Sequence, residues 1–240
     1  MRCVIMQPTF IPWSGYFNLI SRADQFVYLN DVQFEKQSWQ SRNAILLDKK
    51  RFLLTLKVSR GPISRKISEV ELSSEPTWRE KLSRTLRETY GRHPFKESLE
   101  PVLETLSNSC INSLCDFNIQ IIESYCDLLG ITTKKRKSSE LNIRGQRSER
   151  ILNICRSLKC DEYLSPAGAR GYLEEDNLFS ASQVKLTFQN FNPGPYSQLG
   201  SKEFVSHLSI VDIMANLGPQ AAKEYIQTGS YVKEEQLINE

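Results

Sequence analysis

The side chains best suited to chemistry begin in a loop that follows an apolar run near the start of the chain. Gln7, Thr9 and Tyr16 lie in this first loop, QPTFIPWSGYF at residues 7–17. Its two prolines restrict the backbone, and Gly15 would let the backbone approach a ligand closely. The amides of the helix expected next could bind an anion. The alternative is that the prolines and aromatic residues only pack a tight turn.

A second polar loop, LNDVQFEKQSWQSRN at residues 29–43, follows the next apolar run. Asp31 is the carboxylate best placed in the sequence to act as a base or a metal ligand. Gln33, Arg42 and Asn43 could hydrogen-bond a sugar or nucleotide, with an aromatic residue stacking on it. A solvated approach to a hairpin is the alternative interpretation.

A third loop, SPAGARGYL, contains small residues at an expected strand-to-helix junction. Ser165, Gly168, Arg170 and Tyr172 lie in this loop, where backbone amides and a guanidinium group suit a phosphate or a carboxylate. The segment matches neither GxGxxG nor the P-loop pattern GxxxxGK[ST], so it predicts neither of those nucleotide sites. It is a weak signal on its own.

Histidines and cysteines add little support for metal or covalent chemistry. Neither His93 nor His207 has a His or Cys partner at zinc-ligand spacing, so no metal site is expected. His93, between two expected helices, is the candidate for acid or base catalysis, with a structural role as the alternative. The six cysteines lack CxxC spacing and are expected to be mostly buried free thiols. No GxSxG motif is present.

The spacing of apolar residues predicts the elements that must position these loops. An apolar run at 2–6 predicts a buried strand, which is followed by a helix within 15–24 and a strand at 26–32. This order is typical of a β-α-β unit with parallel strands. A hairpin is expected around 48–50, and helical periodicity predicts a helical insertion at about 75–130.

The second half of the chain returns to alternating strands and helices. We expect a strand near residue 131, a helix at 148–159, a short strand at DEYLSP and a strand at 183–191, then two short helices, SIVDIMANLG and PQAAKEYIQTG. The sequence thus predicts a single α/β domain spanning 1–240. Its sheet is expected to be open, mostly parallel and of Rossmann-like type, with a helical insertion or subdomain.

Composition limits the classes of partner. The net charge is +3 and the 31 basic residues are dispersed, so no nucleic acid partner is expected. The one basic run, Lys134–Lys137, is interpreted as a solvated loop, or alternatively as a contact for a phosphate-bearing ligand. No apolar stretch is long enough to predict a membrane span or a signal peptide, so we expect a cytoplasmic protein, for which a homodimer is a possible assembly.

The first two loops together resemble the opening of the WbqC-like family, in IMQPTFIPWSGYFNLISRADQFVYLNDVQFEKQSWQSRN. The segments CDEYLSPAGARGYL, VKLTFQNFNPGPYSQL and HLSIVDIMANLG resemble later blocks of the same family. The resemblance covers most of the chain and is weakest in the helical middle. It implies a bacterial protein of O-antigen, lipopolysaccharide or other surface-polysaccharide biosynthesis. Such a protein would modify a nucleotide-linked amino sugar or a related carbohydrate.

The first loop also resembles, more faintly, the T-F-x-P-x-H-x-G-H pattern of nucleotidyltransferases. Thr9, Pro12 and Gly15 match it, whereas Ser14 and Tyr16 lie in the neighbourhood where that family has histidines. Those histidines neutralise charge developing on the phosphates, so their absence argues against the same chemistry. A pocket shaped for a nucleotide could remain.

These features lead to one leading hypothesis and two alternatives. The leading hypothesis is a transferase that moves an acyl or aminoacyl group onto a nucleotide-linked amino sugar. Asp31 would be the base, Arg42 and Arg170 would hold phosphate or carboxylate groups, and the first loop with Asn43 would orient the substrate. The alternatives are an ATP-dependent ligase or degenerate nucleotidyltransferase, and a non-catalytic binding or scaffold protein of a glycan pathway. The sequence does not identify a cofactor, for which a nucleotide or nucleotide sugar is the candidate.

Overall fold

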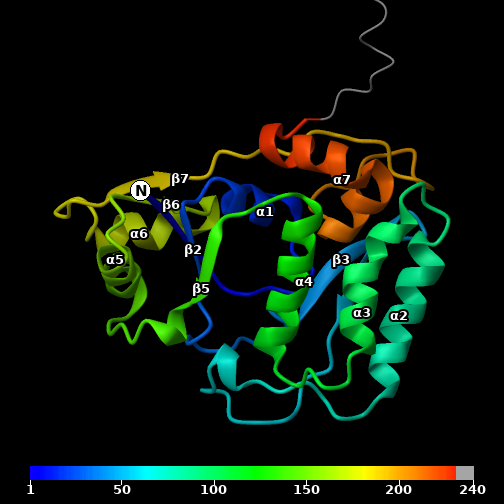
Figure 1. The fold of residues 1–240 in the computed structure, drawn as a ribbon, viewed down its shortest axis with the longest axis horizontal. Helices are drawn as coiled ribbons and strands as arrows, with labels where there is room; N and C mark the ends of the chain where they lie inside the picture. Colours follow the sequence, from blue (N-terminus) through cyan, green and yellow to red (C-terminus); the bar gives the residue numbers. More distant parts are fainter. Residues whose placement is uncertain (231–240) are drawn as a thin grey trace, which may run out of the picture.

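A five-stranded parallel sheet organises the protein (Figure 1). The computed structural model describes residues 1–230. The strands occur in the order β5-β2-β1-β6-β7, and all neighbours are parallel. Their bounds are β1 (Arg2–Met6), β2 (Gln25–Tyr28), β5 (Lys134–Lys137), β6 (Glu162–Ser165) and β7 (Lys185–Phe188). Counted along the sheet strands alone, this order is 3-2-1-4-5, which also begins the sheet of Rossmann-type proteins.

The central strand β1 is buried on both faces. Val4 packs into one hydrophobic core, whereas Cys3 and Ile5 pack into a second core on the opposite face. Successive side chains of a strand point to opposite faces, which explains why the run is continuously apolar. The order of strands reverses at β1, between β2 and β6, and ligands of open α/β sheets collect at the carboxyl ends of strands at such a point.

Helices cover both faces of the sheet. Residues of α1, α4 and α7 belong to the core that contains Val4, and residues of α5 and α6 belong to the other core. The helices are α1 (Ser14–Ser21), α2 (Thr77–Tyr90), α3 (Glu100–Ser107), α4 (Leu114–Leu128), α5 (Arg147–Ser157), α6 (Arg170–Asp176) and α7 (Ile210–Thr228). Short 3-10 turns lie at Ile67–Glu69, Lys96–Leu99, Ser138–Glu140 and Ala167–Ala169. The expected mostly parallel α/β sheet with a helical insertion, α2 to α4, is confirmed.

The hairpin expected around residues 48–50 forms a separate two-stranded antiparallel sheet of β3 (Arg42–Leu47) and β4 (Lys50–Thr55). Its two-residue turn has φ values of +49° at Asp48 and +64° at Lys49. Two positive φ values are typical of the type I′ turn, whose twist matches that of paired strands. The second loop, which leads into the hairpin, contacts the first loop, since the Phe10 amide donates to the carbonyl oxygen of Trp39 at 2.9 Å.

The turn residue Lys49 offers a test of this geometry. Replacing Lys49 with glycine should raise the free energy of unfolding by about 0.5 kcal/mol, because glycine adopts a positive φ without steric cost. Urea unfolding measures the change. The control is Lys50→Gly, which places glycine within β4 and should lower stability. A destabilising effect of Lys49→Gly would contradict the turn assignment.

One sequence prediction of local structure was wrong. The basic run Lys134–Lys137 is the edge strand β5 and not a loop. Acidic side chains of α4 neutralise two of its four cations, since Lys135 pairs with Glu123 at 2.7 Å and Lys137 with Asp116 at 2.6 Å. The two helices expected at the end of the chain are confirmed within α7, where a kink at Gly218, with a φ of +75°, separates them.

The structure bears on two further expectations from composition. Five of the six cysteines are buried free thiols, and Cys110 is exposed. Among the helices of residues 1–230, none combines the length and the apolar character needed to cross a bilayer.

Candidate functional site

A pocket of about 300 Å³ opens at the carboxyl end of β1, where the first loop meets the β3–β4 hairpin. It contains residues that are far apart in the sequence, and we refer to it as the first-loop pocket. Its lining consists of Met6, Thr9, Pro12, Trp13, Tyr16, Trp39, Asn43, Arg51 and His207. Three of the predicted substrate-binding residues, Thr9, Tyr16 and Asn43, are therefore brought together.

Two buried asparagines hold the first loop in place. The Nδ2 group of Asn43 donates to the carbonyl oxygens of Phe10 at 2.9 Å and Ile11 at 3.0 Å. Asn118, on α4, donates through Nδ2 to the carbonyl oxygens of Pro8 at 3.1 Å and Gln40 at 2.8 Å. Buried backbone carbonyls without secondary structure need such partners. The loop is consequently preorganised by side chains from the hairpin and from α4.

The backbone of the first loop is strained at Ile11. This residue is fully buried and has a φ of +35°, which a β-branched residue rarely adopts. Such conformations persist only where surrounding contacts impose them, and they concentrate at functional sites. The hydrogen bond from Asn43 to the Ile11 carbonyl is one of those contacts. The strain therefore favours a functional role over simple turn packing.

Gly15 serves packing more than ligand approach. A Cβ atom at this position would collide with the indole ring of Trp13. The Trp13 ring thus covers the backbone at Gly15 and occupies the space in which the sequence suggested a ligand could approach. Trp13 itself lines the pocket, so the ring forms the surface that a ligand would meet.

Tyr16 contributes a neutral phenol at the base of the pocket. Its hydroxyl donates to the carbonyl oxygen of Gln7 at 3.0 Å. Burial raises the pKa of Tyr16 well above its usual value, so the group stays protonated at physiological pH. The side chain of Gln7 accepts a hydrogen bond from Gln40 Nε2 at 2.9 Å and does not line the pocket. Gln7 therefore helps to hold the first loop in position and does not contact the pocket itself.

Aromatic rings and a cation form the outer wall of the pocket. The imidazole of His207 stacks on Trp13, with ring centroids 4.9 Å apart and an interplanar angle of 29°. The guanidinium carbon of Arg51 lies 5.9 Å from the ring centroid of Trp39, whose side chain is half exposed. Arg51 also donates to the Ser206 carbonyl at 3.4 Å. Flat apolar faces beside a cation suit a sugar or base that carries a phosphate or carboxylate.

The loop that carries His207 is anchored by a buried carboxylate. Asp212, in the first turn of α7, accepts hydrogen bonds from the Tyr90 hydroxyl at 3.0 Å, the Tyr196 hydroxyl at 2.6 Å and Gln198 Nε2 at 2.9 Å. Gln198 in turn donates to the Val205 carbonyl at 3.0 Å. All three partners of the carboxylate are neutral, and burial raises the pKa of Asp212 above its ordinary value.

The raised pKa of Asp212 predicts a pH dependence of stability. Between the ordinary value of 3.8 and the raised value, the native state binds more protons than the unfolded state. The contribution of this group to the free energy of unfolding is therefore greatest at low pH and falls as pH rises through that window. Asp212→Asn removes the titration. Urea unfolding from about pH 4 to about pH 7 should show wild type losing stability relative to the variant, and parallel profiles would contradict the assignment.

Asp31, the predicted base, lies outside the lining of the first-loop pocket. Its carboxylate forms an ion pair with Arg150 of α5 and accepts a hydrogen bond from Ser138 Oγ at 2.5 Å. The side chain is only 14% exposed. The Asp31 carboxylate is thus already paired with Arg150 in this structure. Gln33 also points elsewhere, donating to the Ile63 carbonyl at 3.2 Å.

Arg42 and the third loop do not line the first-loop pocket either. The predicted binding residues that are absent from its lining are Arg42, Ser165, Gly168, Arg170 and Tyr172. The guanidinium of Arg170 lies 4.0 Å from the ring centroid of Phe188 and pairs with Glu174 at 3.0 Å. Ser165 is buried, Tyr172 is half-buried and Gly168 is exposed. These residues could form a separate binding surface, but they are not assembled with the first loop.

His93 lies in a different cavity, beyond the carboxyl end of α2. Its side chain is 7% exposed and packs against Tyr90, with ring centroids 4.8 Å apart. Burial lowers the pKa of His93, which keeps the imidazole neutral near pH 7. The Nδ1 atom has no hydrogen-bond partner within the described residues. His93 and the first-loop pocket therefore belong to different cavities.

Two of the pocket residues were not predicted from the sequence, whereas Trp39 is the aromatic residue that the second loop offered for stacking. Arg51 is the second residue after the hairpin turn and had no pattern of its own. His207 was considered only as a lone histidine, although it begins the segment HLSIVDIMANLG that carries the family resemblance. That resemblance was the one signal that could have identified it. Within residues 1–230, no three His, Cys, Asp or Glu side chains are arranged to hold a metal ion.

Comparison with known proteins gives a family but not an activity. A model of the WbqC-like protein family matches residues 7–224. The chain is 28% identical over 223 residues to the uncharacterized protein Rv1507c of Mycobacterium tuberculosis (strain ATCC 25618 / H37Rv), covering 92% of this chain and 95% of the relative. No solved structure matches the chain significantly. The matched region contains every residue of the first-loop pocket except Met6.

Proposed function

This chain belongs to the WbqC-like family, and from that premise we propose that it is a transferase of bacterial surface-glycan biosynthesis. The substrate is a nucleotide-linked amino sugar held in the first-loop pocket, and the reaction moves an acyl or aminoacyl group onto its amine. The amine nitrogen forms a bond to the acyl carbonyl carbon, the donor's leaving group departs with the electrons of its own bond, and a base takes a proton from the nitrogen. We propose a single α/β domain as the unit that carries this site.

The observation that carries the proposal is the grouping of Trp13, His207 and Arg51 at the carboxyl end of β1. The indole of Trp13 offers a flat face for a sugar or base. Arg51 forms no ion pair within residues 1–230, so its charge is available to a diphosphate. An aromatic face and a free guanidinium together match the two halves of a nucleotide-linked sugar.

Two groups could serve as the base. His207 is exposed, lines the pocket and carries an imidazole, the side chain that most often transfers protons at neutral pH. Asp31 is the alternative that the sequence favours, and it would need to leave Arg150 first. His207→Gln keeps a hydrogen-bonding side chain, whereas Asp31→Asn keeps the shape of the carboxylate. Comparing turnover of the two variants assigns the role.

The proposal is tested by incubating purified protein with nucleotide-linked amino sugars and with acyl-thioester or aminoacyl donors. Mass spectrometry should detect an amino sugar whose mass has increased by the acyl or aminoacyl group. His207→Gln should lower the rate by about 10² to 10⁴, the usual contribution of general acid–base catalysis. Absence of product with every donor would overturn the transferase assignment. Equal turnover of wild type and His207→Gln would remove the role of His207.

One observation keeps a second candidate function open. Thr9 and Pro12, which match the nucleotidyltransferase pattern, both line the pocket. An ATP-dependent ligase would bind ATP with magnesium there. Calorimetry distinguishes the two, because the transferase predicts heat with nucleotide-linked amino sugars and the ligase predicts heat with ATP. If neither ligand raised the melting temperature of the protein but a partner protein did, the scaffold function would be favoured.

A further inference from the structure

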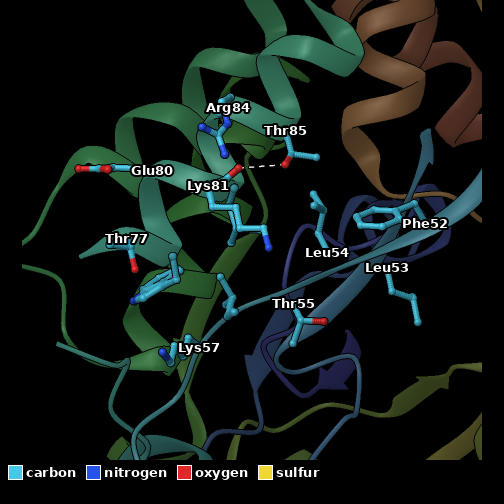
Figure 2. A pocket seen from close by; sticks show the side chains of 13 residues that line it. Phe52, Leu53, Leu54, Thr55, Lys57, Thr77, Glu80, Lys81, Arg84 and Thr85 are labelled. Atoms are coloured by element: carbon cyan, nitrogen blue, oxygen red, sulfur yellow. Dashed lines mark hydrogen bonds between the residues drawn. The ribbon is translucent and has the colours of Figure 1, made fainter. Parts of the chain in front are cut away.

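A groove separates the free edge of β4 from α2, on the side of the hairpin away from β3 (Figure 2). Its volume is about 940 Å³, larger than that of the first-loop pocket. Trp78 and Leu82 of α2 and Leu54 of β4 give it an apolar lining. The described residues place no strand on the outer side of β4, which pairs only with β3 in the two-stranded sheet.

The backbone of β4 presents a regular set of hydrogen-bonding groups to this groove. In a hairpin with a two-residue turn, the residues that flank the turn exchange hydrogen bonds, and every second pair does so after them. Because Leu47 pairs with Lys50, the groups of Phe52 and Leu54 point to β3. The amides and carbonyls of Arg51, Leu53 and Thr55 therefore point outward. No hydrogen bond to another described segment satisfies these three amides.

Charge selects the kind of strand that would fit. Figure 2 shows Lys81 extending from α2 toward β4, whereas the side chain of Glu80, which also lines the groove, points away from β4. Neither Lys81 nor Arg84 forms an ion pair within residues 1–230. The third cation of the groove, Lys57, is neutralised by Glu75. An acidic partner would complement the two unpaired cations.

We propose that this groove binds an extended acidic segment of a partner protein, which adds to the hairpin as a third strand beside β4. Its backbone pairs with the outward groups of Arg51, Leu53 and Thr55, as in recognition by strand addition. Its alternate side chains place apolar groups against Leu54 and Leu82 and carboxylates against Lys81. The groove is closed on its far side by α2, so it admits one strand. A second copy of the chain, pairing through its own β4, would bring its β3 as well.

The probe is an acetylated, amidated peptide of about eight residues in which valine and glutamate alternate. Fluorescence anisotropy should show saturable binding to the full chain that weakens with salt. The same peptide with lysine in place of glutamate should not bind. Hydrogen exchange at the amides of Leu53 and Thr55 should slow on binding, which distinguishes strand addition from loose attraction to the basic surface.

Two variants test the two halves of the proposal. Leu53→Pro removes an outward N–H without removing a hydrogen bond to β3, and it should abolish peptide binding. Leu53→Ala keeps the N–H and should bind within about threefold of wild type. Lys81→Glu with Arg84→Glu should weaken binding at least about tenfold, whereas the matched pair Arg156→Glu with Lys202→Glu, outside the groove, should not.

The proposal fails if the glutamate peptide does not bind at millimolar concentration, or if Leu53→Pro, folded by circular dichroism, binds as wild type does. It also fails if binding leaves exchange at Leu53 and Thr55 unchanged. Sedimentation of the protein without peptide tests whether a second copy of the chain occupies the groove instead. A dimer of wild type that Leu53→Pro dissociates would assign the edge of β4 to a second copy and overturn the assignment to a partner segment.

Discussion

Replacing Arg51 with alanine is expected to weaken the binding of a nucleotide-linked amino sugar by about tenfold to a hundredfold. Arg51 is the cation that lines the first-loop pocket, and its guanidinium lies beside the exposed indole of Trp39. A charge-assisted hydrogen bond to phosphate contributes about 1.5 to 3 kcal/mol, and each 1.4 kcal/mol corresponds to a factor of ten in affinity. Arg51→Lys should recover only part of the loss, because lysine keeps the charge but not the planar stacking group.

Titration calorimetry measures both dissociation constants. The matched control is Lys50→Ala, which removes one positive charge from the adjacent position of the same strand and does not line the pocket. Its affinity should stay close to that of wild type. Equal losses for the Arg51 and Lys50 variants would show that only general charge attraction matters, and would contradict a phosphate contact at Arg51.

The second large effect concerns stability. Asn118→Leu is expected to lower the free energy of unfolding by about 3 kcal/mol, because it removes the donor for two buried carbonyl groups. Those carbonyls belong to Pro8 and Gln40, which lie in the first and second loops. The substitution should therefore loosen both sides of the pocket at once. Ligand affinity should fall along with stability.

Urea unfolding followed by circular dichroism measures this loss. Asn153→Ala is the control, since its Nδ2 group also donates to a backbone carbonyl, that of Arg144 at 3.2 Å, but in an exposed setting. We expect that variant to lose less than about 1 kcal/mol. If the Asn118 variant unfolds at the same urea concentration as wild type, the two hydrogen bonds do not hold the loops.

The sheet was predictable because its strands are short apolar runs separated by clear turn and helix signals. The run at residues 2–6 is buried on both faces and gave the central strand directly. A strand was expected near residue 131, but the run Lys134–Lys137 that forms it was interpreted as a loop because its sequence is wholly basic. Edge strands often carry lysine, and the neutralising carboxylates come from α4, a tertiary contact that periodicity does not reveal.

The candidate site was predictable only where residues close together in the sequence form it. Thr9 and Tyr16 lie in the first loop, and Asn43 is the second residue of the hairpin that packs on it, so local patterns identified all three as candidates. Arg51 and His207 reach the same pocket from positions 156 residues apart, which only the folded chain reveals. Asp31, by contrast, was predicted for the site but does not line the pocket, because it pairs with Arg150, 119 residues later, and the sequence gives no sign of that contact.

The central claim is that the first-loop pocket holds the ligand, and the three tryptophans report on it directly. Trp13 and Trp39 line the pocket, whereas Trp78 lies in the β4–α2 groove and donates its indole N–H to Ser73. In ¹H–¹⁵N spectra, titration with nucleotide-linked amino sugars should shift the indole signals of Trp13 and Trp39 in a saturable way and leave that of Trp78 in place. Saturable binding that leaves Trp13 and Trp39 unshifted would contradict the account.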